Sequence, residues 1–182
     1  AVTIPTVATV TASVGAFSAA ATLTVNPTSP PPVGSDLSEG DPLAWQAFAD
    51  PPYTATVAVD ATHVKSGASS LRFVTDSGSD CGLRYVVPGG AHWDLRGVRF
   101  LTFWSFGSGT EAYQGEQPVV VLRGPGGSIR LRPPSDQTVN GEWRFHRVPL
   151  GDASDWAVTT EGSPSLGDIT SFEIHQDVWG AG

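Results

Sequence analysis

The chain has 182 residues, a formal net charge of −8, 21 glycines, 15 prolines and one cysteine. The acidic balance argues against nucleic-acid binding, because phosphate contacts need a basic patch. The single cysteine, Cys81, excludes an internal disulfide, and no apolar run approaches the roughly 20 residues of a membrane-spanning helix. Glycine and proline recur at the spacing typical of an all-β fold, and no window keeps a helical apolar stripe.

Residues 1–27 read AVTIPTVATVTASVGAFSAAATLTVNP and predict two strands joined by a turn at Gly15. The ending ATLTVNP resembles the end of a bacterial immunoglobulin-like repeat, so we expect a partial immunoglobulin-like β-hairpin. Residues 28–36 contain three successive prolines, which favour polyproline II and predict a semi-rigid linker. The main unit is then residues 37–182.

Alternating apolar and polar residues predict strands throughout the main unit. Residues 98–106 are nearly all apolar, which predicts a central strand covered on both faces. Residues 118–133 predict a hairpin with a glycine-rich tip at 124–127. The other predicted strands span residues 54–62, 69–76, 81–88, 142–150 and 168–179. About eight strands are enough for a jelly roll, so the predicted fold class is an all-β antiparallel β-sandwich.

Five motifs follow one another in the main unit: SEGDPLAWQAF at 38–48, VKSGASSLRF at 64–73, WDLRGVRFLTFWSF at 93–106, NGEWRFHRVPL at 140–150 and LGDITSFEIHQDVW at 166–179. In this order, over about residues 36–182, they resemble the galactose-binding-like jelly roll of bacterial carbohydrate-binding modules. The resemblance implies a non-catalytic carbohydrate-binding module of a large secreted or cell-surface bacterial protein. Its expected location is therefore extracellular or on the cell surface.

The family usually continues with one further strand, so we expect this chain to be a fragment truncated before its last strand. Residues 171–179 would then lie at an open sheet edge, which is a hazard for a soluble protein. We expect another strand to fill that edge. It would come from the N-terminal hairpin, a neighbouring domain or another copy of the chain.

Polar side chains that alternate outward on the predicted strands are candidates for a ligand surface. They are Arg84, Arg123, Ser128, Arg130, Arg132, His146, Glu173, His175 and Asp177. If one sheet holds them, they form a groove of planar donors and acceptors suited to sugar hydroxyls. The alternative is the solvated face of an antiparallel sheet, with charges paired across the strands.

Aromatic side chains provide a second signal, because sugar rings stack their apolar C–H faces on exposed aromatic rings. Three of the six tryptophans, Trp45, Trp104 and Trp143, match positions that a sandwich would bury. The better ligand candidates follow turns or lie in or beside loops, and they are Trp93, Tyr113, Trp156 and Trp179. Burial in the core is the alternative for each of these four.

The resemblance also implies a structural calcium ion between the early Glu-Gly segment, a Ser-Gly turn and an aspartate of the final strand. The matching residues here are Asp36 or Asp41, Glu39, Ser66 and Gly67. Loop carbonyls and carboxylates of this kind suit calcium, which takes six to eight oxygen ligands. The alternative is an acidic, solvated loop.

The chain carries no G-x-S-x-G motif and no P-loop, so we expect no enzyme. His146, His175 and Asp177 could bind a transition metal, but nothing else in the sequence completes a ligand shell. Glu173 and Asp177 are about 13 Å apart along a strand, too far for a glycosidase pair without another strand's help. The alternative to carbohydrate binding is a structural stalk or filament module that assembles by strand complementation.

Overall fold

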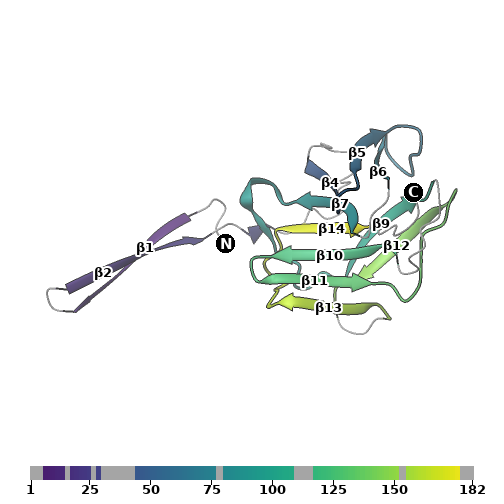
Figure 1. Cartoon of the computed structure of the whole chain (residues 1–182). Helices are drawn as coiled ribbons and strands as arrows, with labels where there is room; N and C mark the ends of the chain where they lie inside the picture. The colour runs from purple at the N-terminus through teal and green to yellow at the C-terminus, as the bar shows by residue number, and fades with distance from the viewer. Residues whose placement is uncertain are drawn as a thin grey trace.

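The regular elements that the computed structural model describes are β-strands, together with a short 3₁₀ turn at Pro88–Gly90 (Figure 1). The structure describes residues 6–14, 17–25, 28–29, 44–76, 80–108, 117–151 and 155–176. These residues contain no α-helix, and their strands pair in antiparallel sheets, with one short parallel pair. The predicted all-β sandwich is therefore confirmed. No helix among these residues is long and apolar enough to cross a membrane.

One layer is a six-stranded antiparallel sheet with the strand order β13-β11-β10-β14-β7-β4 (Figure 1). Its strands are β4 (Trp45–Ala49), β7 (Cys81–Val86), β10 (Val119–Gly124), β11 (Gly127–Arg132), β13 (Ala157–Gly162) and β14 (Ser171–His175). The predicted hairpin at 118–133 is confirmed as β10 and β11. At its tip Gly127 has a φ of 137°, a conformation that only glycine adopts without strain.

Strand β14 lies in the interior of this sheet, where it pairs with β10 on one side and with β7 on the other. The predicted open edge at 171–179 is therefore wrong for residues 171–175, because both of their backbone edges are already hydrogen-bonded. The sheet instead ends at β4 and at β13. The sequence predicted neither of these strands.

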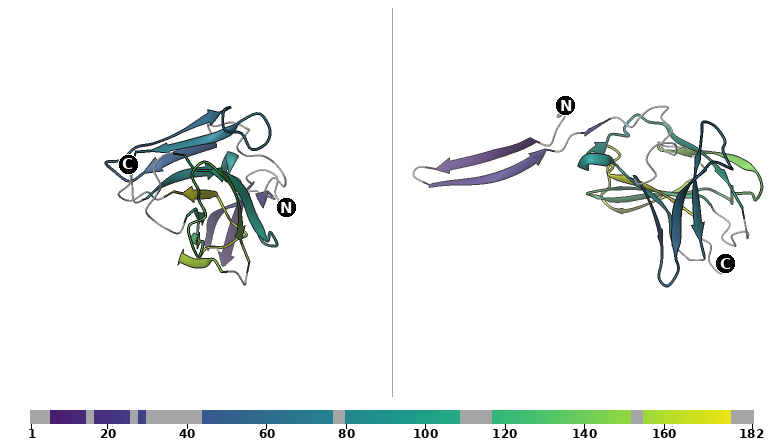
Figure 2. Two further views of the ribbon diagram at one scale, coloured as in Figure 1. Left: turned by 90° about the vertical axis from the view of Figure 1, so that its right-hand side faces the viewer. Right: turned by 90° about the horizontal axis from the view of Figure 1, so that it is seen from above.

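The other layer is formed by two antiparallel strand pairs (Figure 2). Strand β9 (Phe100–Phe106) pairs with β12 (Trp143–Pro149), and β5 (Ala55–Asp60) pairs with β6 (Ser70–Thr75). The prediction that 98–106 is a central strand covered on both faces is wrong. Among the described strands β9 pairs only with β12, and its outward side chains Thr102 and Trp104 are exposed.

The hydrophobic core fills the space between the inner face of the six-stranded sheet and the second layer. Its buried members are Trp45, Tyr85, Val87, Trp93, Leu95, Val120, Leu122, Leu131, Val148, Leu150, Trp156, Ile169 and Phe172. Aromatic rings pack at its centre, with ring centroids 5.3 Å apart for Trp45 and Tyr85 and 5.5 Å apart for Tyr85 and Trp93. Offset and edge contacts of this kind stabilise a core beyond the burial of area.

Towards the N-terminus, β1 (Thr6–Val14) and β2 (Phe17–Val25) form an antiparallel hairpin, which confirms the predicted strand pair. Its likeness to an immunoglobulin-like repeat stays a prediction. The short strand β3 (Thr28–Ser29) pairs in parallel with β8 (His92–Trp93), just after the 3₁₀ turn at Pro88–Gly90. The remaining residues of the predicted linker lie outside the described ranges.

Candidate functional site

The outer face of the six-stranded sheet carries a row of polar side chains. The cross-strand register places Arg84 opposite Glu173, Glu173 opposite Val121, Val121 opposite Arg130, and Arg130 opposite Thr159. Residues directly opposite one another in a sheet point to the same face. Polar residues that are far apart in the sequence are therefore neighbours on one surface, which we call the polar face.

Glu173, a buried carboxylate, lies in the middle of the polar face and accepts hydrogen bonds from its neighbours. Arg84 Nε donates to Glu173 Oε1 at 2.6 Å, and Arg123 donates to both carboxylate oxygens, through Nε at 2.7 Å and Nη2 at 3.0 Å. His175 Nε2 lies 2.9 Å from Glu173 Oε2, and its Nδ1 lies 3.0 Å from the carboxylate of Asp80. Glu173 is fully buried, so this network replaces the water that the charge would otherwise need.

The network sets the protonation state of Glu173. Burial by itself raises the pKa of this carboxyl, because it disfavours the charged form. Hydrogen bonds from His175, Arg123 and Arg84 outweigh burial and lower the pKa to about 2. Glu173 is therefore a fixed anion that orients two guanidinium groups, and it is unsuited to donate a proton near neutral pH.

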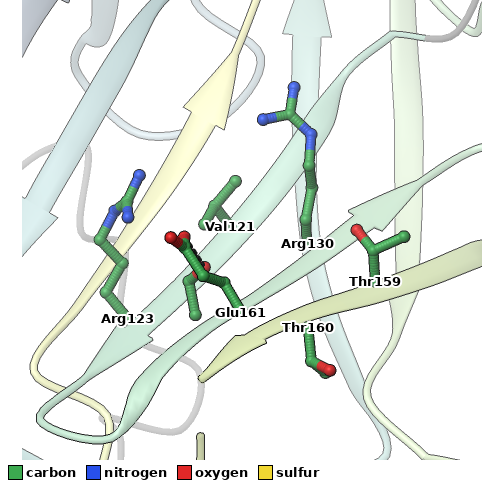
Figure 3. A pocket seen from close by; sticks show the side chains of 7 residues that line it. Val121, Arg123, Arg130, Thr159, Thr160 and Glu161 are labelled. Atoms are coloured by element: carbon green, nitrogen blue, oxygen red, sulfur yellow. Dashed lines mark hydrogen bonds between the residues drawn. The ribbon is translucent and has the colours of Figure 1, made fainter. Parts of the chain in front are cut away.

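Beside this network the polar face is hollowed over β10, β11 and β13 (Figure 3). The hollow has a volume of about 180 Å³ and is lined by Val121, Arg123, Ser128, Arg130, Thr159, Thr160 and Glu161. Figure 3 shows Arg123 and Arg130 rising on two sides of it. Ser128 Oγ donates to Glu161 Oε2 at 3.5 Å, so the wall formed by β11 and β13 is hydrogen-bonded across the strands.

The structure brings two of the predicted carbohydrate-binding residues, Arg123 and Arg130, into the hollow. Arg132 is exposed on the same strand as Arg130, two residues further along, and does not line the hollow. His175 is buried beside Glu173 on the same face of β14, against the ring of Phe48 at a centroid distance of 5.1 Å. It therefore supports the polar face from within and presents no surface to a ligand.

Two predicted ligand aromatics, Trp93 and Trp156, are buried in the core, with exposed fractions of 6% and 8%. The prediction that they bind carbohydrate is therefore wrong. Trp93 follows a Pro-Gly-Gly turn, but its backbone pairs with that of Ile169 at 2.7 and 3.0 Å and draws the indole inward. There it stacks on Phe172, with ring centroids 5.8 Å apart.

His146 also differs from its prediction. It lies on β12, points inward and is completely buried, so it does not share the polar face. Its Nε2 lies 2.7 Å from Ser105 Oγ, and burial lowers the pKa of His146 to about 4, against a smaller raising effect of Asp136. A metal site built from His146 and His175 is contradicted, because the two residues lie on different sheets of the sandwich.

Several predicted site residues fall outside the described part of the chain. They are Tyr113, Asp177 and Trp179 of the carbohydrate prediction, and Asp36, Glu39 and Asp41 of the calcium prediction. Ser66 and Gly67 lie exposed in the loop between β5 and β6. Among the residues that are described, no three His, Cys, Asp or Glu side chains gather around a point that could hold a metal ion. The calcium site stays a prediction.

The sequence interpretation missed a second surface. Trp104, Phe106, Trp143 and Phe145 occupy the outer face of β9 and β12, and we call them the aromatic face. Trp104 and Phe145 have exposed fractions of 44% and 52%. The alternation in residues 142–150 already placed Trp143 and Phe145 on the strand face opposite to His146. The apolar run at 98–106, however, predicted a strand covered on both faces, so Trp104 was expected to be buried.

No protein-family model, no curated protein and no solved structure matches the chain. Functional inference therefore depends on the chemistry of the two surfaces, the polar face with its hollow and the aromatic face.

Proposed function

We propose that the protein is a non-catalytic carbohydrate-binding module and that the hollow of the polar face receives the sugar. The observation that carries this proposal is the position of Arg123. Its guanidinium is held by the buried carboxylate of Glu173, and its side chain also lines the hollow. The hollow therefore has a donor group that is oriented before any ligand arrives.

The chemistry of the hollow suits sugar hydroxyls, which donate and accept hydrogen bonds at the same time. Arginine offers several donors in a planar fork, and Glu161 offers acceptors across the hollow. Ser128 and Thr159 add hydroxyl groups that do both. Because Arg123 is already ordered, binding loses less side-chain entropy than it would with a mobile arginine. The residues described around the hollow include no aromatic ring, so we expect weak binding through hydrogen bonds.

The motif order in residues 36–182 and the sandwich fold both agree with a galactose-binding-like module. We accordingly propose a glycan ligand and an extracellular or cell-surface location. A structural calcium ion held by the segment around Glu39, Ser66 and Gly67 is part of the same proposal. Calorimetric titration of calcium into metal-free protein tests it, and a rise in thermal stability with bound calcium is expected.

The sugar site is tested by titrating a panel of neutral oligosaccharides against the 182-residue chain by isothermal calorimetry. Glu161→Gln and Arg130→Gln line the hollow without touching Glu173, and each is expected to weaken binding about tenfold. Glu142→Gln is the matched control, because its carboxylate is exposed at the start of β12 and pairs with Arg144. Binding that survives both hollow variants, or the absence of any neutral ligand, would contradict the proposal.

The alternative function is a structural module that assembles by strand complementation. Its candidate edge strand is β13, in place of residues 171–179. All six residues of β13 are exposed, and in the described structure β13 pairs only with β11. An exposed edge strand can template pairing with another chain. Sedimentation velocity over a hundredfold concentration range tests this alternative. Association that is abolished by Val158→Pro and is insensitive to sugars would favour it.

A further inference from the structure

The aromatic face carries four rings. Trp104 and Phe145 are exposed, whereas Phe106 and Trp143 are half-buried, and the His63 ring packs on Phe106 at a centroid distance of 5.0 Å. Trp104 lies directly opposite Phe145 and Phe106 directly opposite Trp143, with ring centroids 5.1 and 5.5 Å apart. Side chains two residues apart on one strand face are separated by about 7 Å, so the two pairs follow one another along the ladder. Exposed aromatic groups that gather in this way mark an interaction site more often than scattered ones do.

Cationic side chains border the aromatic face. Lys65 places Nζ 4.0 Å from the centroid of the Trp104 ring, and Arg147 places Cζ 3.5 Å from the centroid of Phe100. Lys65 comes from the loop between β5 and β6, whereas Arg147 follows Phe145 on β12. Neither cation forms a salt bridge with a described acidic residue. The acidic chain, with its net charge of −8, thus holds Lys65 against the exposed ring of Trp104 and Arg147 against the half-buried ring of Phe100.

This combination selects one kind of occupant. The rings can stack on the C–H faces of sugar residues, and the flanking cations can pair with acidic groups on the same polymer. A purely apolar partner would have to strip water from Lys65 and Arg147 without compensating their charges, which is costly. The charges are therefore complementary to an acidic ligand.

We propose that the aromatic face is a second glycan site, and that it binds an acidic polysaccharide, one that carries carboxylate or sulfate groups. Trp104 and Phe145 stack on its sugar rings, while Lys65 and Arg147 pair with its acidic groups. The inference rests on the proposed function only in assuming that the module binds glycans. The site itself lies on the opposite layer from the hollow and shares no residue with it.

The test compares polygalacturonate with its fully methyl-esterified form, which keeps the sugar rings and removes the negative charges. Intrinsic fluorescence of the full chain reports binding, because Trp104 is part of the aromatic face. We expect polygalacturonate to bind at least tenfold more tightly than the ester and to lose affinity as salt rises. Heparin serves as the sulfated probe and is expected to behave in the same way.

Matched variants locate the site. Phe145→Ala and Lys65→Gln are each expected to weaken polygalacturonate binding about tenfold. Tyr53→Ala removes another exposed aromatic ring, and Arg72→Gln removes another exposed cation, so these two control variants should bind like the wild type. Circular dichroism of every variant confirms that the fold is intact.

Other outcomes overturn the inference in distinguishable ways. Equal binding of polygalacturonate and its ester would remove the acidic selectivity. Binding that is lost in Arg130→Gln but kept in Phe145→Ala would move the glycan to the hollow and leave the proposed function standing. No binding of either acidic probe would overturn the second site, while the neutral panel separately decides the first. A dimer that Phe145→Ala dissolves would make a second copy of the chain the occupant.

Discussion

The outer surfaces of the two layers differ in the kind of side chain they carry and in whether those side chains have partners within the protein. On the six-stranded sheet the outward residues include a fully buried carboxylate, which accepts hydrogen bonds from two arginines and contacts a histidine. On the β9–β12 pair the outward residues are aromatic, and two of them are half exposed. The polar face therefore satisfies its charges internally, whereas the aromatic face leaves apolar area in water. A surface of the second kind is the more direct indication of a partner.

The comparison predicts a loss of stability when the charge network is broken. Glu173→Leu leaves Arg84 and Arg123 without their shared carboxylate, but their side chains are 37% and 42% exposed, so water compensates part of the loss. We therefore expect a cost of about 1–3 kcal/mol, below that of a fully buried pair. Urea denaturation followed by fluorescence measures the loss.

A triple variant sharpens this result. Arg84→Met, Glu173→Leu and Arg123→Met together remove the charges as well as the pairing, so we expect the triple variant to be more stable than Glu173→Leu alone. If the triple variant is the less stable one, the network stabilises the protein through packing more than through charge compensation.

Aromatic residues offer a second contrast. Trp93 is buried against both Tyr85 and Phe172, so Trp93→Ala should cost about 3–5 kcal/mol by leaving a cavity. Phe145 is half exposed, and Phe145→Ala should change stability by less than about 1 kcal/mol. Paired denaturation curves give both values. Similar losses in the two variants would mean that the aromatic face is part of the core.

The pH dependence of stability separates two buried groups. His146 is neutral in the folded state, where its pKa is about 4, but in the unfolded chain it regains the ordinary histidine pKa of 6.5 and takes up a proton below that pH. Its contribution is therefore complete above pH 6.5 and is lost as the pH falls towards 4, by about 2 kcal/mol at pH 5. Thermal unfolding of His146→Gln should show a smaller loss than the wild type between pH 7 and pH 5.

Glu173 contributes to the pH dependence of stability in a lower pH range than His146. Its pKa is about 2 in the folded state, against the ordinary glutamate value of 4.5 in the unfolded chain. The stability that it contributes is therefore complete above pH 4.5 and is lost as the pH falls through 2. Unfolding of Glu173→Gln should show less dependence on pH than the wild type between pH 4.5 and pH 2.5. An unchanged slope there would mean that the carboxyl is not ionised in the network.

The smallest effect is expected at an exposed ion pair on the second layer. Arg144 Nη2 lies 2.9 Å from Glu142 Oε2, and both side chains are about half exposed. Exposed pairs of this kind contribute from about 0 to 1 kcal/mol. Arg144→Gln should therefore leave the denaturation midpoint nearly unchanged. A loss comparable to that of Glu173→Leu would erase the distinction between buried and exposed charge pairs.

Alternation along the chain predicted most of the strands and several of their faces. Leu83 and Tyr85 point away from Arg84, as expected, and Arg123 and Arg130 share one face of their hairpin. The strands β4 and β13 were not predicted. Residues 157–162 are short, exposed and rich in threonine, so the apolar alternation that marks a half-buried strand is absent there.

The sequence by itself determined the two-residue period, and with it the all-β class and the side of each strand on which a polar residue falls. Only the tertiary structure decided which strands are neighbours. It placed β14 between β10 and β7, buried Trp93 and His146, and left Trp104 and Phe145 in solvent. The physical reason is that alternation depends on each strand's own geometry, whereas burial depends on contacts with segments far away in the chain.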